Sequence, residues 1–226
     1  MTSPVTYRLS DNVAMIGMDD GKVNCVNQPL LTALEEALVR AEQEAQAVVW
    51  TGRPGMFSGG FDLKVFQQGI EPAKQLTAAG NRFLIRLLST PLPLVIASSG
   101  HAVAMGAFLL LTGDLRIGVE GQYKYWLNEV AIGITMPHFA LALTQDRLSP
   151  RYQTRAVLTA EPFSPADACS AGFLDHVVAA DALEETAVAH AKRLATLNGD
   201  AFAATKARLR GPVLTWLRTA LEQEFA

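Results

Sequence analysis

The chain has 226 residues, of which 50% are hydrophobic and 18% are charged, and its formal net charge is −3. This length fits one domain, and the apolar content is enough to build a core, which excludes a disordered or low-complexity protein. The net negative charge argues against nucleic acid as the main partner, because there is no basic excess to neutralise phosphate groups.

The first quarter of the chain predicts a hairpin, a helix and a strand. Residues 5–9 and 13–18 are β-rich runs on either side of the turn-forming residues 10–12, which predicts an opening hairpin. Between residues 27 and 46, apolar residues follow the i, i+3, i+4, i+7 spacing of a helix, and Pro29 falls near its first turn. Residues 47–51 then predict a buried strand.

The middle of the chain alternates loops, helices and strands. Glycines and a proline within 52–60 predict a loop, and 71–89 predicts a helix that ends before Pro91 and Pro93. Residues 94–98 predict a strand, Gly100 a turn, 106–112 a short helix buried on all sides, and 115–119 another strand.

The alternation of strands and helices is typical of βαβ crossovers, so the fold class is α/β. After residue 137 the pattern predicts helices with one short break near 174–178. We therefore expect a single domain over 1–226, with a sheet-containing core over about 1–180 and a helical segment over about 181–226. No internal sequence repeat stands out.

Several features indicate the compartment and exclude metal chemistry. Cys25 and Cys169 lack CxxC spacing and are too few for a disulfide framework, and no cluster of potential ligands has metal-site spacing. Residues 1–10 do not resemble a signal peptide, and no uncharged apolar run reaches the ~18 residues of a membrane span. The prediction is a cytoplasmic protein with no membrane partner, no nucleic acid partner and no metal.

Two glycine-containing loops, 57–63 and 100–106, each follow a predicted strand and lead into a helix. The N–H groups of a helix's first turn have no intrahelical partner and lie at the positive end of its dipole. Two such groups converging on one oxygen would form an oxyanion hole, which stabilises developing negative charge. The glycines can equally serve only to make tight turns, and the residues alone leave both interpretations open.

The residues around these loops resemble the crotonase (enoyl-CoA hydratase/isomerase) superfamily. Residues 57–63, FSGGFDL, resemble the family's F-S-A-G-A-D-L, and residues 93–114 resemble its segment from K-P-V-I-A to the following Asp. The spacing from Gly100 to Asp114 matches the family without a gap. Residues 24–27, 161–178 and 205–206 also resemble family segments, so the likeness covers nearly the whole chain. It implies a crotonase-like (ClpP/crotonase) fold with a repeated ββα core and a helical C-terminal region.

The resemblance also implies an active site. It assigns the two oxyanion-hole N–H groups to Gly59 and Met105, and it assigns an acid/base role to Glu129. Where family hydratases carry another catalytic Glu, this chain has Phe108. From the residues alone, Glu129 can also be a solvent-facing or helix-capping carboxylate, but its apolar neighbours predict desolvation and a raised pKa.

One carboxylate in place of two favours isomerisation over hydration. Moving a double bond from C3 to C2 requires only removing a proton from C2 and returning it at C4. Residues 127–129, LNE, followed by Gly133, Ile134 and Pro137, resemble the Δ3,Δ2-enoyl-CoA isomerases of the family. Two alternatives stay open: Glu129 activates water for hydration or thioester hydrolysis, or the protein binds acyl-CoA without catalysis.

The resemblance further implies a coenzyme A thioester as substrate and no separate cofactor. The predicted substrate contacts are spread over two loops and the acyl pocket: Val23, Asn24, Phe57, Phe61, Asp62, Lys64, Phe108 and Trp126. Asp62 can instead be structural, Lys64 can be a solvated surface lysine, and His101 and His138 fall on no family catalytic position. The family likeness also predicts a homotrimer or a dimer of trimers.

Overall fold

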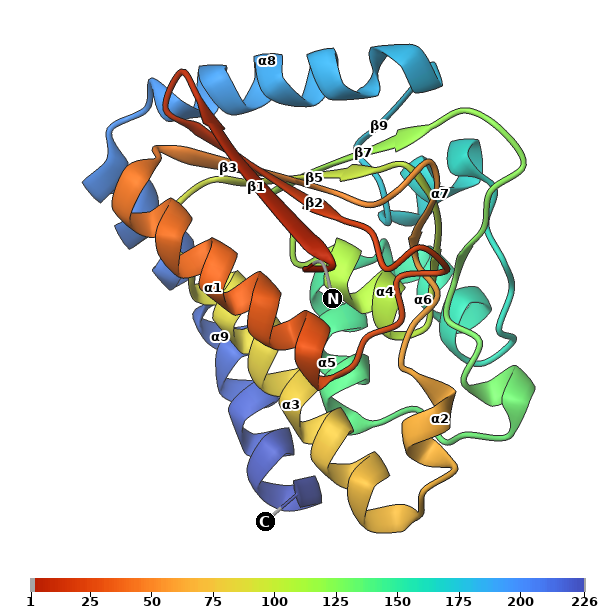
Figure 1. The fold of residues 1–226 in the computed structure, drawn as a ribbon. Helices are drawn as coiled ribbons and strands as arrows, with labels where there is room; N and C mark the ends of the chain where they lie inside the picture. The colour runs from red at the N-terminus through yellow and green to blue at the C-terminus, as the bar shows by residue number, and fades with distance from the viewer. Residues whose placement is uncertain (1–2, 226) are drawn as a thin grey trace.

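The computed structural model describes residues 3–225, which form two sheets surrounded by helices (Figure 1). The larger sheet has six strands in the order β1-β2-β3-β5-β7-β9 and is parallel except for the β1-β2 hairpin. These strands are Val5–Ser10 (β1), Val13–Met18 (β2), Ala47–Thr51 (β3), Leu94–Ser98 (β5), Leu115–Val119 (β7) and His176–Val178 (β9). The smaller sheet is parallel throughout and consists of Gly55–Ser58 (β4), Gly100–Val103 (β6) and Tyr125–Trp126 (β8).

The chain builds these sheets by repeating one unit three times. In each unit, one strand enters the larger sheet, the next enters the smaller sheet, and helical structure follows. The units begin at β3, β5 and β7, and the helical segments after them are Leu63–Phe66 (α2) with Ile70–Ser89 (α3), then Met105–Leu111 (α4), then Val130–Ile132 (η1) with His138–Arg147 (α5). This arrangement confirms the predicted crotonase-like class with its repeated ββα core.

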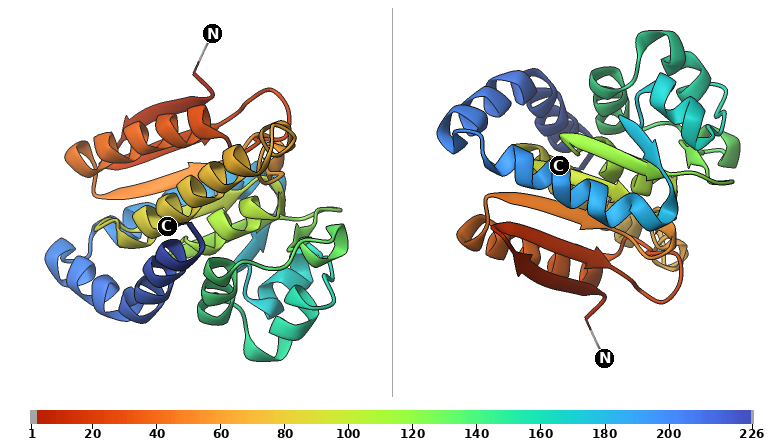
Figure 2. Two further views of the ribbon diagram at one scale, coloured as in Figure 1. Left: turned by 90° about the horizontal axis from the view of Figure 1, so that it is seen from below. Right: turned by 90° about the horizontal axis from the view of Figure 1, so that it is seen from above.

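Helices cover both faces of the larger sheet, as the views in Figure 2 show. On one face, Val49, Val95 and Ile117 pack against Leu183–Ala195 (α8). On the other face, Val48, Trp50 and their neighbours pack with Gln28–Glu44 (α1), α3 and α4 in the main core. Because successive side chains of a strand point to opposite faces, apolar runs such as residues 47–50 supply both layers.

The remaining helices follow the third unit. They are Pro150–Val157 (α6), Pro165–Ala171 (α7), the turn Ala180–Ala182 (η2) and Gly199–Phe225 (α9). The long helix α9 packs against α3 and α5. The buried Lys206 Nζ donates to the Asp114 carboxylate at 2.6 Å and to the Leu92 carbonyl at 3.1 Å, which fixes α9 to the end of the sheet.

The structure corrects several local predictions. Residues 52–60 are not wholly loop, because they contain β4, and Gly100 lies in β6 and not in a turn. The strand β8 and the short helix α2 have no counterpart among the sequence predictions, and the strand β9 lies in the break predicted near 174–178. The glycines of β4 and β6 make this strand pair hard to recognise in the sequence. They are needed for the close contact of the two strands, since a Cβ on Gly100 would lie 2.0 Å from the carbonyl carbon of Gly55. A pattern search takes such glycines as loop signals, although here they allow two strands to approach closely.

The approach of α4 to β4 gives a stability prediction. A Cβ on Gly106 would lie 2.3 Å from the Ser58 carbonyl oxygen, so Gly106→Ala must push α4 away from β4. We expect this change to lower the free energy of unfolding by about 1–3 kcal/mol in urea denaturation. Gly199→Ala is the matched control, because an added Cβ there meets nothing within 4 Å. Equal losses in both variants would contradict the close approach.

Candidate active site

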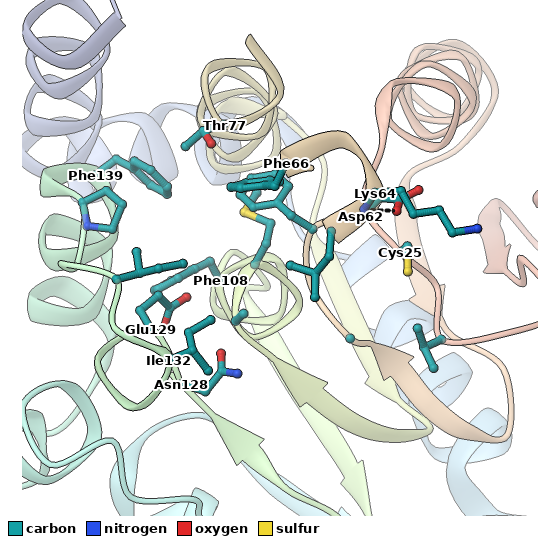
Figure 3. A pocket seen from close by; sticks show the side chains of 18 residues that line it. Cys25, Asp62, Lys64, Phe66, Thr77, Phe108, Asn128, Glu129, Ile132 and Phe139 are labelled. Atoms are coloured by element: carbon teal, nitrogen blue, oxygen red, sulfur yellow. Dashed lines mark hydrogen bonds between the residues drawn. The ribbon is translucent and has the colours of Figure 1, made fainter. Parts of the chain in front are cut away.

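A cavity of about 460 Å³ lies where the three strands of the smaller sheet end (Figure 3). Phe61 follows the end of β4 by three residues, Met105 follows β6 by two, and Glu129 follows β8 by three, and all three residues line the cavity. Parallel strands end at one edge of their sheet, so each ββα unit contributes one residue to the same place.

The N–H of Gly59, predicted to be a free oxyanion donor, is already used. It donates to the Val23 carbonyl oxygen at 2.8 Å. The loop that carries Val23 is held by the Asp20 carboxylate, which accepts backbone N–H groups from Lys22, Asn24 and Cys25. The prediction for Gly59 is therefore corrected: this residue lines the cavity but does not offer it a free N–H.

Phe61, two residues further on, has the free N–H that Gly59 lacks. A parallel bridge joins Val26 to Phe61: the Val26 N–H donates to the Gly60 carbonyl at 2.8 Å, and the Asp62 N–H donates to the Val26 carbonyl at 3.0 Å. Phe61 lies between these bonded groups, so its own N–H is directed away from the bridge. Within residues 3–225 it has no hydrogen-bond acceptor.

Met105 supplies a second free N–H next to Phe61. As the first residue of α4 it has no intrahelical acceptor for its N–H, and within the described chain it has no other. A Cβ on Gly60 would lie 3.4 Å from the Met105 nitrogen, which brings the Met105 N–H close to the peptide bond that joins Gly60 and Phe61. The role of Met105 as an oxyanion donor stays a prediction, for which this N–H is available.

The backbone at Ala104 is strained so that Met105 can take this position. Ala104 has φ 49° and ψ −126°, a conformation that L-residues with a Cβ rarely adopt. Strained residues of this kind persist where the surrounding structure requires them, and they cluster at functional sites. Here the Ala104 N–H donates to the Trp126 carbonyl at 2.8 Å, which ties the start of α4 to β8.

Glu129 is a buried carboxylate that faces the cavity. Its exposed fraction is 8%, and its Oε2 atom is fully buried with no hydrogen-bond partner among residues 3–225. Burial in apolar surroundings disfavours the charged form and raises the pKa of Glu129 to about 7. A carboxylate with a pKa near the working pH is suited to accept and return protons. The Oδ1 atom of Asn128, also on the cavity lining, is likewise buried and unpartnered within that range.

Asp62 lines the cavity too, but its carboxylate is occupied. It caps α2 by accepting the Lys64 N–H at 3.0 Å, and it accepts a hydrogen bond from the Asn27 amide at 3.4 Å. The Lys64 side chain is exposed and lies on the same side of the cavity as Asp62 (Figure 3). These contacts favour the structural interpretation of Asp62 and leave the Lys64 ammonium available to an anion.

Phe108 forms the opposite side of the cavity together with Phe139. Both rings are 2% exposed, and their centroids lie 6.1 Å apart with an edge-to-face angle of 70°. Phe108 therefore lines the site as predicted, with an apolar ring beside Glu129 (Figure 3).

Three of the predicted substrate contacts do not line this cavity. Asn24 is fully buried, and its amide donates to the Met18 and Phe57 carbonyl groups, while Phe57 packs against Trp50 in the core. The Trp126 indole N–H donates to the Ala160 carbonyl at 2.7 Å, outside the cavity lining. For the Trp126 side chain the prediction that it lines the acyl pocket is corrected to a structural role. The side chains of Asn24 and Phe57 are structural as well, and the predicted contacts of their loops with CoA stay a prediction.

Neither histidine singled out in the sequence lines the cavity. The Nδ1 atom of His101 accepts the Lys124 N–H at 3.0 Å, which joins β6 to the segment before β8. His138 begins α5, and its backbone N–H donates to the Glu224 carboxylate at 2.8 Å. Within residues 3–225, no cluster of three potential ligands could hold a metal ion, and no helix is long and apolar enough to cross a membrane.

Sequence reasoning missed several cavity residues, which are Phe66, Thr77, Asn128, Ile132, Ile134, Pro137 and Phe139. The residues after Glu129 could have been found, because they belong to the segment that resembled the isomerases. Phe66 and Thr77 carry no local signal, since their place at the cavity depends on how α2 and α3 fold over the smaller sheet.

Comparisons with known proteins show the family of the chain. The sequence model of the enoyl-CoA hydratase/isomerase family matches residues 8–226. The human mitochondrial enoyl-CoA delta isomerase 1 is 29% identical over 204 residues, which cover 88% of this chain and 67% of the relative.

Among solved structures, an enoyl-CoA hydratase/isomerase family protein from Pseudomonas syringae superposes with a TM-score of 0.96 at 44% identity, covering 97% of this chain and 96% of that one. An enoyl-CoA hydratase from Mycobacterium marinum superposes with a TM-score of 0.93 at 40% identity, and the match covers 99% of this chain and 100% of that one. The names of these proteins include both isomerase and hydratase, so the names do not decide between the two reactions.

The buried carboxyl group predicts a pH-dependent stability. The pKa of Glu129 is about 7 in the folded protein, which is higher than in the unfolded chain. At pH values between these two pKa values, the folded state therefore binds one proton more than the unfolded state. Stability from this group is complete below the unfolded pKa and is lost as the pH rises through about 7. Full ionisation then costs on the order of 3 kcal/mol.

We therefore expect Glu129→Gln to melt at a higher temperature than the unmutated protein at pH 8 and at a similar temperature at pH 5. Glu36→Gln, which changes an exposed residue of α1, is the control and should leave the difference between the two pH values unchanged. Thermal unfolding followed by circular dichroism measures both. A Glu129→Gln variant that is less stable than the unmutated protein at pH 8 would show that the carboxylate has a partner in solution.

Proposed function

The chain belongs to the enoyl-CoA hydratase/isomerase family, and we propose that it is an enoyl-CoA isomerase that moves a double bond from C3 to C2 of an acyl-CoA. The observation that carries this proposal is the buried carboxylate of Glu129, whose Oε2 atom has no hydrogen-bond partner within residues 3–225, in a cavity where two backbone N–H groups have no acceptor in that range either.

The oxyanion hole in this proposal is formed by the N–H groups of Phe61 and Met105. The thioester carbonyl oxygen accepts hydrogen bonds from both, and it becomes an enolate oxygen when a proton leaves C2. Donors that are fixed by the backbone before the reaction do not need to reorganise as this charge develops, which is the main source of their effect. The bridge between Val26 and Phe61 fixes one donor, and the strained Ala104 fixes the other.

Glu129 is the base and then the acid. Its carboxylate removes a proton from C2 of the 3-enoyl thioester, which gives a dienolate, and the resulting carboxylic acid returns the proton at C4. The electron pair of the broken C2–H bond first forms the C1=C2 bond of the dienolate, while the carbonyl pair moves to the oxygen. On protonation the old C3=C4 pair forms the C4–H bond, the C1=C2 pair becomes the C2=C3 bond and the carbonyl reforms, so no other group is consumed. A pKa of about 7 suits both steps, because neither the protonated nor the ionised form of Glu129 is strongly favoured.

Phe108 supports isomerisation over hydration. Hydration needs a water molecule that is held and activated while C2 is protonated, which in family hydratases takes two carboxyl groups. Here the position of the first catalytic Glu of those hydratases is held by the phenyl ring of Phe108, which is 2% exposed and packs against Phe139. An apolar ring offers water no hydrogen bond and raises the cost of bringing it beside the substrate.

A second candidate function has one observation in its favour. The Oδ1 atom of Asn128 and the Oε2 atom of Glu129 are both buried and unpartnered within residues 3–225, and both residues line the cavity. A water molecule has two hydrogens and could donate to both oxygens, which would prepare it for hydration or for thioester hydrolysis.

Oligomer formation, as a trimer or a dimer of trimers, stays a prediction that light scattering can test.

Parallel incubations test the proposed function. The protein is incubated with 3-enoyl-CoA, with 2-enoyl-CoA and with a saturated acyl-CoA, and product mass, free thiol and enoyl absorbance are followed. We expect conversion of 3-enoyl-CoA to 2-enoyl-CoA without a gain of mass and without release of thiol. A gain of one water from 2-enoyl-CoA would support hydration, release of thiol would support hydrolysis, and binding without any conversion would support a non-catalytic protein.

The role of Glu129 has its own prediction. Glu129→Gln keeps the size of the side chain but cannot accept the C2 proton, so kcat should fall by about 10²–10⁴-fold. The affinity for a saturated acyl-CoA, measured by isothermal titration calorimetry, should change little because the thioester oxygen is held by the Phe61 and Met105 N–H groups. Glu36→Gln again serves as the control and should keep full activity. Normal turnover by Glu129→Gln would remove Glu129 from the mechanism.

A further inference from the structure

The cavity has two unequal ends. At one end lie Cys25, Asp62 and Lys64 (Figure 3). Val23 and Leu63, which are close to them in the sequence and also line the cavity, are exposed and indicate an opening to solvent. A charged and partly exposed entrance suits the polar CoA arm, whereas the apolar side of the cavity beyond Glu129 suits the acyl chain.

The acyl side is closed by an aromatic pair. Phe108 extends from α4 and Phe139 from the first turn of α5, and both rings face the cavity although each is only 2% exposed. Their neighbours on the same two helices belong to the main core, since Leu109, Ala140 and Leu143 have no measurable exposure. An acyl chain that runs straight past Glu129 therefore meets these two rings.

The size of the cavity limits the chain that fits. A water molecule takes about 30 Å³ in the liquid, and a methylene group is similar, so about 460 Å³ holds about 15 non-hydrogen atoms. The sulfur, the adjoining two carbons and nitrogen of the CoA arm and the thioester oxygen take about five of these positions, which leaves about ten for acyl carbons.

A second route for the chain passes Ile132 and Ile134, which line the cavity and are 53% and 41% exposed. Methylene groups that leave by this route stay half in water and gain only part of the transfer free energy of burial. The closed aromatic end buries them fully, so it is the more favourable place for an apolar chain.

We propose that Phe108 and Phe139 end the acyl pocket and restrict the protein to short- and medium-chain acyl-CoA substrates of up to about ten carbons. This inference rests on the proposed function only in taking acyl-CoA as the ligand. Phe108 then has two effects. Its ring stands where family hydratases carry a catalytic Glu, and the same ring forms part of the end of the acyl pocket.

Binding of saturated acyl-CoA thioesters of increasing length tests the inference without any turnover. Isothermal titration should give an affinity that rises about fourfold per methylene, as expected for full burial, and then falls beyond about ten carbons. Phe139→Ala should move this maximum to chains longer by about two to four carbons, because truncation vacates the space of several non-hydrogen atoms. Phe139→Leu should give a smaller shift in the same direction and covers the case in which the alanine variant does not fold.

Two control variants separate the two routes. Phe66→Ala removes the same type of ring from the side of the cavity, next to Phe61, and should change the affinity for all chain lengths by one common factor. Ile134→Ala should leave the position of the maximum unchanged. An affinity that stays level from ten to sixteen carbons, or a maximum that moves with Ile134→Ala and not with Phe139→Ala, would overturn the inference.

The failures of the two proposals are distinguishable. If the binding series behaves as expected while 3-enoyl-CoA is not converted, the pocket's limit stands and the isomerase function fails. If 3-enoyl-CoA is converted while affinity does not depend on Phe139, the function stands and the limit fails.

Discussion

The site depends on one constraint, the parallel pairing of the three short strands β4, β6 and β8. Each strand ends at the same edge, and the next few residues of each ββα unit supply the Phe61 N–H, the Met105 N–H and the Glu129 carboxylate in turn. The close approach of Gly100 to Gly55 and of Gly106 to Ser58 allows the strands and α4 to come together. Without this pairing, two hydrogen-bond donors and one acceptor from distant parts of the sequence would not face one cavity.

The two walls of the cavity have opposite polarity. One offers free N–H donors, and the other offers the unpartnered oxygens of Glu129 and Asn128 within the described chain. A thioester suits this arrangement, because its carbonyl oxygen is an acceptor and its C2–H is a weak acid. Unpartnered buried oxygens and a strained Ala104 are unfavourable for stability, and such features are expected where function requires them. The raised pKa of Glu129 has the same origin, because burial makes the ionised carboxylate unfavourable in the folded protein.

The sequence predicted the site well where the chemistry depends on side chains within one segment. It predicted the site less well where the chemistry depends on backbone hydrogen bonds between distant segments. The roles of Glu129 and Phe108 followed from family resemblance, and both residues line the cavity. The choice of Gly59 failed because glycine content does not reveal which N–H is free. That depends on the Val23 carbonyl, which takes the Gly59 N–H, and on the bridge to Val26, which leaves the Phe61 N–H unused. The repeated ββα unit could be expected only through the family resemblance, since its three copies follow the same path through space but show no sequence repeat.

The central claim is that one carboxyl group carries the proton from C2 to C4. The most direct measurement uses a 3-enoyl-CoA that is deuterated at C2, in ordinary water, with the deuterium content at C4 of the 2-enoyl product determined by mass spectrometry and NMR after a single turnover. Because Glu129 is only 8% exposed, exchange of its proton with solvent should be slow enough for part of the deuterium to be retained. The account predicts a product that carries deuterium at C4. A product whose C4 hydrogen comes entirely from solvent, even in a single turnover, would contradict it.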